Sequence, residues 1–160
     1  MSYLQTLERE QWIPRPLEQV FSFFGDAENL ERITPPWLNF QILSPCPIQM
    51  AVGAKIVYQM SWHAVPMRWT TEIVEWNPPF GFVDLQLKGP YRQWRHSHSF
   101  AAERQGTVMK DLVRYELPFG WLGRFAHALA VRKNLTEIFD YRVRAISEIF
   151  AQPEQSLEVR

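Results

Sequence analysis

The sequence predicts a single α+β domain in which one long C-terminal helix lies over a curved, seven-stranded antiparallel sheet. Six segments between residues 37 and 118 alternate apolar and polar side chains with the period of a strand. Their connections are short and rich in turn residues, which is typical of an antiparallel meander. Residues 121–150 instead follow the helical period. A helix of about 29 residues is roughly 43 Å long, so it can cross a sheet of ten-residue strands about 33 Å long.

The N-terminal elements precede this meander. Residues 3–13 are expected to form a first strand, and "PRPLEQVFSFF" then predicts a helix with Pro16 in its first turn, where the missing N–H costs nothing. Gly25 ends this helix, and Asp26 can cap a second short helix, "AENLERI". The six further strands are expected at 37–44, 54–63, 66–76, 80–88, 91–102 and 107–118. The domain therefore spans residues 1–150, and the polar residues 151–160 form a flexible tail.

Composition narrows the classes of function. The 160 residues contain 14% aromatic side chains, including seven Trp and eleven Phe, which fits either a bulky core or an aromatic-lined cavity. Basic and acidic residues both number 17 and form no basic block, so we expect no nucleic-acid partner. One cysteine, Cys46, and the lack of a signal-like or membrane-spanning segment predict a cytoplasmic protein without an intrachain disulfide. The sequence indicates no oligomeric state.

The order of elements and three stretches carry a resemblance to a known family. The stretches are "IPRPLEQVFSFFGDAENLERITPPWL" (13–38), "GPYRQWRHSHSF" (89–100) and "DLVRYELPFG" (111–120). They resemble the Bet v 1/START-like superfamily, also called SRPBCC or helix-grip, and within it a bacterial ligand-binding, cyclase/dehydrase-like subgroup. The resemblance covers about residues 3–146 and implies a hydrophobic cavity under the C-terminal helix. Lipid carriers, hormone receptors and polyketide cyclases share this fold, so it does not fix one function.

Two histidines in "RHSHSF" raise the question of a site. If "ERQG" (103–106) is a hairpin loop, Ala102 faces Thr107 and His98 faces Asp111. One face of this hairpin then points at the long helix and carries Trp94, His96, His98, Phe100, Met109, Asp111, Val113 and Tyr115. Buried polar groups need partners, so we hypothesise a His98–Asp111 pair on the cavity wall.

The neighbouring hairpin has two possible registers. With a two-residue "GP" loop, Val83, Leu85 and Leu87 share the histidine face, whereas a three-residue or bulged "KGP" loop places Phe82, Asp84 and Gln86 there. The resemblance favours the second register. It would add Asp84 and Gln86 to the polar groups near His96.

We favour a binding function, in which these polar groups orient the head of a hydrophobic ligand. Its predicted binding residues are Trp69, Asp84, Gln86, Trp94, His96, His98, Met109, Asp111, Tyr115, Phe125 and Leu129. The alternative is a cyclase or dehydratase in which His96 or His98 acts as the base, Asp111 orients it and Tyr115 donates a proton.

Two further interpretations remain open. "HSH" places two imidazoles about 6.6 Å apart along one strand face, and Asp111 or Asp84 could complete a zinc or iron site. Two histidines in a strand are a weak signal, so we predict neither a metal nor another cofactor. Finally, the histidines and Asp111 could satisfy each other in a filled core, in which case the protein would serve as a partner-binding module.

Overall fold

The computed structural model describes residues 4–118 and 121–151, and the side chains of all of these except residues 121–128. Seven strands form one antiparallel sheet in the order β1-β7-β6-β5-β4-β3-β2. The strands are β1 (Gln5–Ile13), β2 (Gln41–Ile42), β3 (Lys55–Trp62), β4 (Val65–Asn77), β5 (Gly81–Lys88), β6 (Gln93–Glu103) and β7 (Gly106–Glu116). The helices are α1 (Leu17–Phe24), the 3₁₀ segments η1 (Ala27–Ile33) and η2 (Pro36–Leu38), and α2 (Trp121–Ala151).

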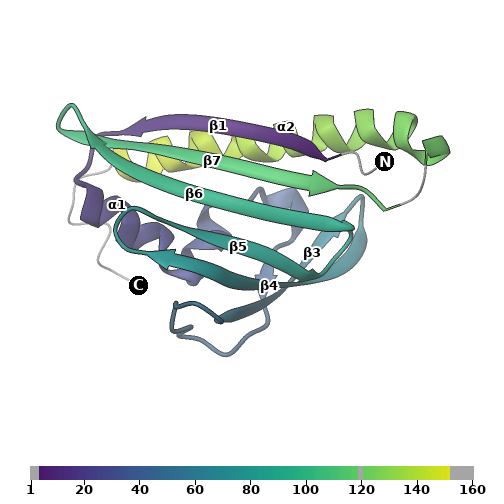
Figure 1. Cartoon of the computed structure of the whole chain (residues 1–160), viewed down its shortest axis with the longest axis horizontal. Helices are drawn as coiled ribbons and strands as arrows, with labels where there is room; N and C mark the ends of the chain where they lie inside the picture. Colours follow the sequence, from purple (N-terminus) through teal and green to yellow (C-terminus); the bar gives the residue numbers. More distant parts are fainter. Residues whose placement is uncertain (1–3, 119–120, 152–160) are drawn as a thin grey trace.

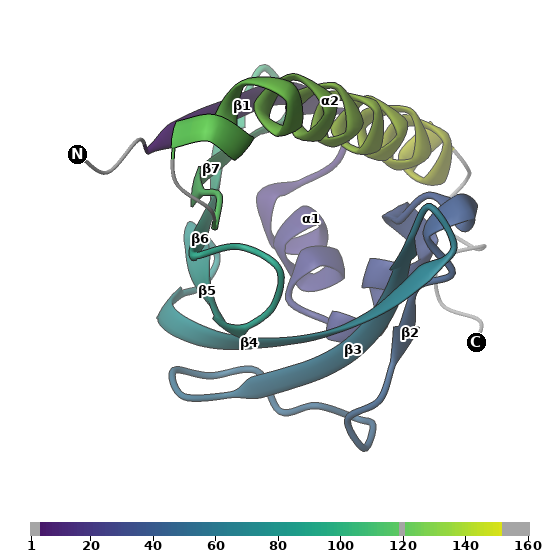
Figure 2. The same ribbon diagram turned by 90° about the vertical axis from the view of Figure 1, so that its right-hand side faces the viewer.

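The sheet curves strongly, and α2 lies across its open side (Figures 1 and 2). Figure 2 shows α1 within the curve of the sheet, and α1 packs against the C-terminal end of α2. The α+β architecture, the seven strands and the long C-terminal helix predicted from the sequence are therefore confirmed. Among the described residues, no helix is both long and apolar enough to cross a membrane.

Two N-terminal predictions need correction. The strand expected at 37–44 shrinks to the two residues of β2, because the prolines before it start the η2 turn and Asn39 then takes a left-handed conformation with φ 45°. The second short helix forms, but as 3₁₀ rather than α-helix. Asp26 caps it as predicted, since its carboxylate accepts a hydrogen bond of 2.9 Å from the backbone N–H of Glu28.

The predicted register of β6 and β7 is confirmed, with His98 opposite Asp111. The connection is tighter than the expected four-residue loop, because Glu103 already pairs with Gly106. The two residues between them, Arg104 and Gln105, both have positive φ (49° and 60°), as a two-residue hairpin turn of type I′ requires. A shorter loop with the same pairing leaves every side chain on its predicted face.

β5 adopts the second of the two predicted registers against β6. Asp84 pairs with His96, and Phe82 pairs with His98. Three neighbouring strands therefore present polar side chains at the same level of the inner face, Asp84 from β5, the histidines from β6 and Asp111 from β7.

The apolar core is divided into two clusters on either side of these polar residues. One joins α1 to β6 and to the end of α2, through ring contacts such as Phe21–Phe100 at 5.7 Å and Phe23–Phe150 at 5.2 Å. The other gathers Trp69, Trp94, Val113 and Tyr115 of the sheet with Leu135 and Phe139 of α2. Apolar contacts therefore join α2 to the sheet on both sides of the polar residues.

Candidate functional site

A cavity of about 380 Å³ lies between the inner face of the sheet and the helices α1, η1 and α2. This volume is within the range of small-molecule sites, which runs from about 300 to 1,000 Å³. Most of its wall is aromatic or otherwise apolar. The aromatic part consists of Phe23, Phe24, Phe40, Tyr58, Trp62, Trp69, Phe82, Tyr91, Trp94 and Phe139.

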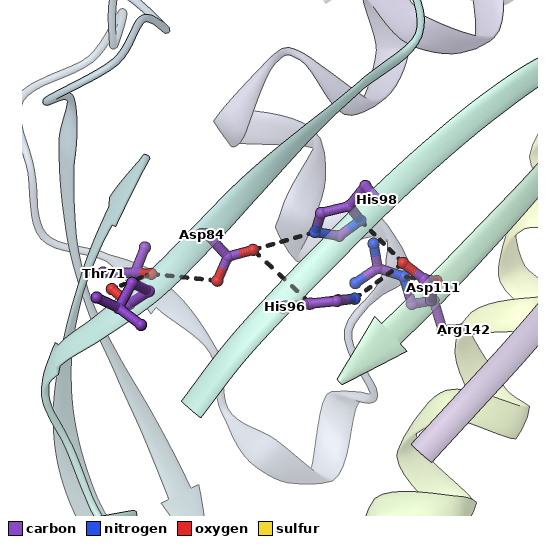
Figure 3. Close-up of polar contacts among 7 residues, drawn as sticks. Thr71, Asp84, His96, His98, Asp111 and Arg142 are labelled. Carbon is purple, nitrogen blue, oxygen red and sulfur yellow. Dashed lines mark hydrogen bonds and ion pairs between the residues drawn. The ribbon is translucent and has the colours of Figure 1, made fainter. Parts of the chain in front are cut away.

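A polar patch around Asp84, His96 and His98 interrupts this apolar wall (Figure 3). Asp84, His96 and His98 all line the cavity. Asp84 Oδ2 lies 3.1 Å from His98 Nε2 and 3.8 Å from His96 Nδ1. The hydroxyl of Thr71 lies 3.2 Å from the other carboxylate oxygen of Asp84 and 3.1 Å from the carbonyl oxygen of Leu85, so it can donate to either.

A second carboxylate, Asp111, contacts the opposite side of both imidazoles. Its Oδ1 lies 2.9 Å from His96 Nε2 and 2.8 Å from His98 Nδ1, and its side chain is only 7% exposed. The guanidinium of Arg142 approaches from α2, with Nε 3.7 Å from Asp111 Oδ2. The sequence-based His98–Asp111 pair therefore exists, but as part of a cluster of five ionisable groups.

Packing fixes the orientation of the two rings. Phe82 stacks on His98 with ring centroids 4.2 Å apart, and the centroids of His96 and His98 are separated by 3.8 Å. Phe139 of α2 contacts His96 edge-on at 5.6 Å. The imidazoles are confined by these contacts on their faces and by the carboxylates at their edges.

Burial opposes the charged forms of both histidines, but the outcome differs between them. For His98, contacts with Asp111 and Asp84 outweigh burial and raise the pKa above its usual value. For His96, burial together with the charge of His98 lowers the pKa, against the attraction of Asp111. Of the two imidazoles, His98 is therefore the one whose charged form the surroundings favour.

The two carboxylates stay ionised despite burial. Burial alone would raise the pKa of Asp111, but the charge of Arg142 and the nearby histidines hold that pKa well below its usual value. Burial opposes ionisation of Asp84 too, and the hydrogen bond with His98 reverses it, so its pKa is also lowered. Two ionised carboxylates thus lie beside the imidazole of His98, whose charged form they favour, and one of them also faces Arg142.

The structure brings five of the predicted binding residues together on the cavity wall, namely Trp69, Asp84, Trp94, His96 and His98. Four others, all on the sheet, do not line it. The side chain of Gln86 turns to the following loop, where its Nε2 donates to the carbonyl oxygen of Tyr91 at 2.7 Å. The hydroxyl of Tyr115 donates to Gln5 Oε1 at 3.0 Å.

The other two predicted residues of the sheet that do not line the cavity are Met109 and Asp111. Met109 lies opposite Phe100, where it packs in the core cluster around α1 instead of contacting the cavity. Asp111 is turned toward the two imidazoles and Arg142 rather than toward the open space.

The two predicted binding residues on α2 have different outcomes. Leu129 is 71% exposed and does not line the cavity. It precedes Val131, which does line the cavity, by two residues, and this step rotates the side chain about 200° around the helix. The side chain of Phe125 lies outside the described residues.

The sequence reasoning missed several wall residues, of which Arg142 is the most informative. It follows Leu135 and Phe139 by seven and three residues, so it lies on the same buried stripe of α2. A charged side chain on an apolar helical stripe is the signal that could have identified it. Tyr58 and Tyr91 gave no comparable signal, because aromatic residues are common throughout this chain.

Comparison with known proteins supports the same architecture. A family model described as "Polyketide cyclase / dehydrase and lipid transport" matches residues 13–139. Protein CV1439 from Chromobacterium violaceum is 12% identical with a TM-score of 0.72, and the match covers 93% of this chain and 99% of that one. Protein TTHA0849 from Thermus thermophilus is 20% identical with a TM-score of 0.68, over 90% and 95% of the two chains.

A third structure shows the same fold within a longer protein. The chain is 23% identical to a nucleoside-diphosphate sugar epimerase from Corynebacterium glutamicum, with a TM-score of 0.63 over 89% of this chain but 28% of that one. Among curated proteins, none matches this sequence. At these identities the structural likeness supports the fold and leaves the ligand and the reaction open.

Proposed function

The chain belongs to the polyketide cyclase/dehydrase and lipid transport family, and we propose that it binds a hydrophobic small molecule with a polar end in the cavity under α2. The observation that carries the proposal is the cavity itself, about 380 Å³ of space with an aromatic wall and a polar patch. Apolar pockets with a few placed polar groups are the usual form of small-molecule sites. Burial of the ligand's apolar body would supply affinity, and the patch would set its orientation.

Two indole groups on the wall support a ligand that also carries a hydrogen-bond acceptor. The Nε1 atoms of Trp62 and Trp69 are buried, and neither has a hydrogen-bond partner among the described residues. A buried donor without a partner costs about 1–3 kcal/mol. An acceptor on the ligand would relieve part of this cost.

The geometry supports binding more than the cyclase or dehydratase alternative. A general base needs a free nitrogen within reach of the substrate, whereas both ring nitrogens of His98 lie against carboxylate oxygens. The hydroxyl of Tyr115, the predicted proton donor, is engaged by Gln5 and does not line the cavity. The contacts of His98 and of Tyr115 therefore do not favour catalysis by the predicted set of His98, Asp111 and Tyr115.

The proposal can be tested with N-phenyl-1-naphthylamine, a neutral apolar dye that fluoresces when it leaves water. Ile138 lies on α2 and lines the cavity, so Ile138→Trp should fill part of the space. We expect saturable dye binding by the wild-type protein and a loss of at least tenfold in affinity, about 1.4 kcal/mol, in this variant. Val131→Trp probes a second level of the same wall.

The matched control is Leu129→Trp, which adds the same side chain to the outer surface of α2. It should bind the dye within twofold of the wild-type protein. Thermal melting checks that each variant folds. Wild-type protein that does not bind the dye saturably, or equal affinity in the Ile138→Trp and Leu129→Trp variants, would overturn the proposal.

A further inference from the structure

Both imidazoles of the polar patch lie between the same two carboxylates. Each directs one nitrogen at Asp84 and the other at Asp111 (Figure 3). Toward Asp84, His98 Nε2 and His96 Nδ1 approach the same oxygen, at 3.1 and 3.8 Å. Toward Asp111, the remaining nitrogens again converge on one oxygen, at 2.8 and 2.9 Å.

The Asp84 side has the dimensions of a coordination site. One ligand atom each from Asp84, His96 and His98 can be chosen so that all three lie within 4.8 Å of one another. Two donors bound at about 2.0–2.1 Å to one tetrahedral ion are separated by roughly 3.3 Å. The two distances to Asp84 Oδ2, 3.1 and 3.8 Å, lie on either side of this value.

The Asp111 side has the arrangement of an outer coordination shell. Histidines that bind a metal usually donate their second N–H to a carboxylate or carbonyl, which fixes the tautomer and the ring orientation. Asp111 occupies this position for both rings, and Arg142 approaches its second oxygen. The three inner residues line the cavity, while Asp111 lies behind them and does not.

We propose that Asp84, His96 and His98 bind a divalent first-row transition metal ion whose remaining coordination positions face the cavity. Two imidazoles and one carboxylate with open positions suit ions such as Zn²⁺ and Fe²⁺. This proposal goes beyond the binding of a hydrophobic ligand and stands independently of it. It also replaces the sequence-based expectation of no metal, because strand β5 supplies a third ligand next to the "HSH" pair.

The test uses the full-length protein after chelator treatment, with Co²⁺ as a spectroscopic probe. We expect one Co²⁺ per chain, with visible absorption bands that Zn²⁺ displaces by competition. Asp84→Asn and His98→Gln each remove one donor at nearly constant volume and should weaken Co²⁺ binding at least tenfold. Melting curves of the metal-free variants show whether they fold.

The matched control removes two exposed candidate ligands, His63 and Cys46. A Cys46→Ser/His63→Gln double variant should bind Co²⁺ as the wild-type protein does. Asp111→Asn provides a second readout, because loss of an outer-shell partner typically weakens metal binding 10- to 100-fold while the inner ligands remain. In this variant the absorption bands should persist at higher Co²⁺ concentration.

Three outcomes would overturn the proposal. They are the absence of saturable Co²⁺ binding by the wild-type protein, unchanged affinity in folded Asp84→Asn protein, and loss of binding in the control double variant. Because the dye reports the apolar cavity and Co²⁺ reports the polar patch, the two proposals can fail separately.

Discussion

Replacing Asp111 by asparagine should destabilise the protein more than any single surface charge change. The carboxylate is 7% exposed and contacts His96, His98 and Arg142 at 2.9, 2.8 and 3.7 Å. Asparagine has nearly the same volume as aspartate but no charge. The buried cationic groups beside it then lose the negative charge that offsets the cost of removing them from water. The charge of Arg142 is then the main uncompensated group, because its side chain is only 12% exposed.

Removing one partner of a buried ion pair typically costs about 3–5 kcal/mol. For a chain of 160 residues, each kcal/mol lowers Tm by about 2–4 °C, so Asp111→Asn should lower Tm by roughly 6–20 °C. By contrast, Glu10→Gln breaks the exposed pair with Lys110, where the two charged atoms lie 2.8 Å apart and both side chains are more than half exposed. That control should leave the free energy of unfolding nearly unchanged, because solvent screens an exposed ion pair.

A double-mutant cycle separates the charge effect from packing. Arg142→Met removes the cation at similar length, so the double variant Asp111→Asn/Arg142→Met should be more stable than the sum of the single changes predicts. We expect a coupling of about 1–3 kcal/mol, measured by urea denaturation of chelator-treated protein. An Asp111→Asn cost no larger than that of Glu10→Gln, or strictly additive single changes, would refute the description of the patch as a charge-compensated cluster.

Three further predictions concern the neighbouring groups. The free energy of unfolding of metal-free protein should be maximal near pH 6.5, the ordinary histidine pKa. Because the pKa of His96 is lowered in the folded protein, the unfolded chain binds more protons below that pH, and stability falls as the pH decreases. Because the pKa of His98 is raised, the folded protein binds more protons above that pH, and stability falls as the pH increases. Urea denaturation at several pH values should show that His98→Gln removes the alkaline fall and His96→Gln the acidic one. Thr71→Val should cost about 1 kcal/mol in the same assay, since it removes the hydroxyl beside Asp84. Tyr115→Phe should also lower the free energy of unfolding by about 1 kcal/mol, because it removes the hydrogen bond to Gln5. It should leave dye affinity within twofold, because this hydroxyl lies outside the cavity. A large loss of dye affinity would show instead that the hydroxyl takes part in ligand binding.

Local patterns in the sequence were sufficient to predict the fold. Alternation along β6 and β7 and the turn residues between them gave the pairing of His98 with Asp111, even though the loop is two residues long instead of four. The same residues are paired with the two-residue turn as with the expected four-residue loop. The difference in loop length therefore moved no side chain to the other face of the sheet. The resemblance to the SRPBCC superfamily is confirmed by the family match and by the solved structures.

The composition of the site was harder to predict, because it depends on contacts between distant elements. Whether Asp84 joins the histidines depends on the register of β5 against β6, for which the sequence allowed two solutions. The face of α2 that meets the cavity is set by its docking on the sheet, which turned Arg142 inward and Leu129 outward. The direction of the side chain also kept Gln86 out of the cavity wall, because its amide donates to the loop after β5 although its strand position faces inward.

The most direct test of the binding proposal is native mass spectrometry of the protein purified from the organism that makes it. The wild-type protein should carry a non-covalent organic molecule that is lost on denaturing extraction, and the Ile138→Trp variant should carry little or none of it. A mass difference of a single metal ion, lost in Asp84→Asn, would concern the metal site instead. If the wild-type protein carries no more organic adduct than Ile138→Trp does, the claim that this cavity holds a hydrophobic ligand is contradicted.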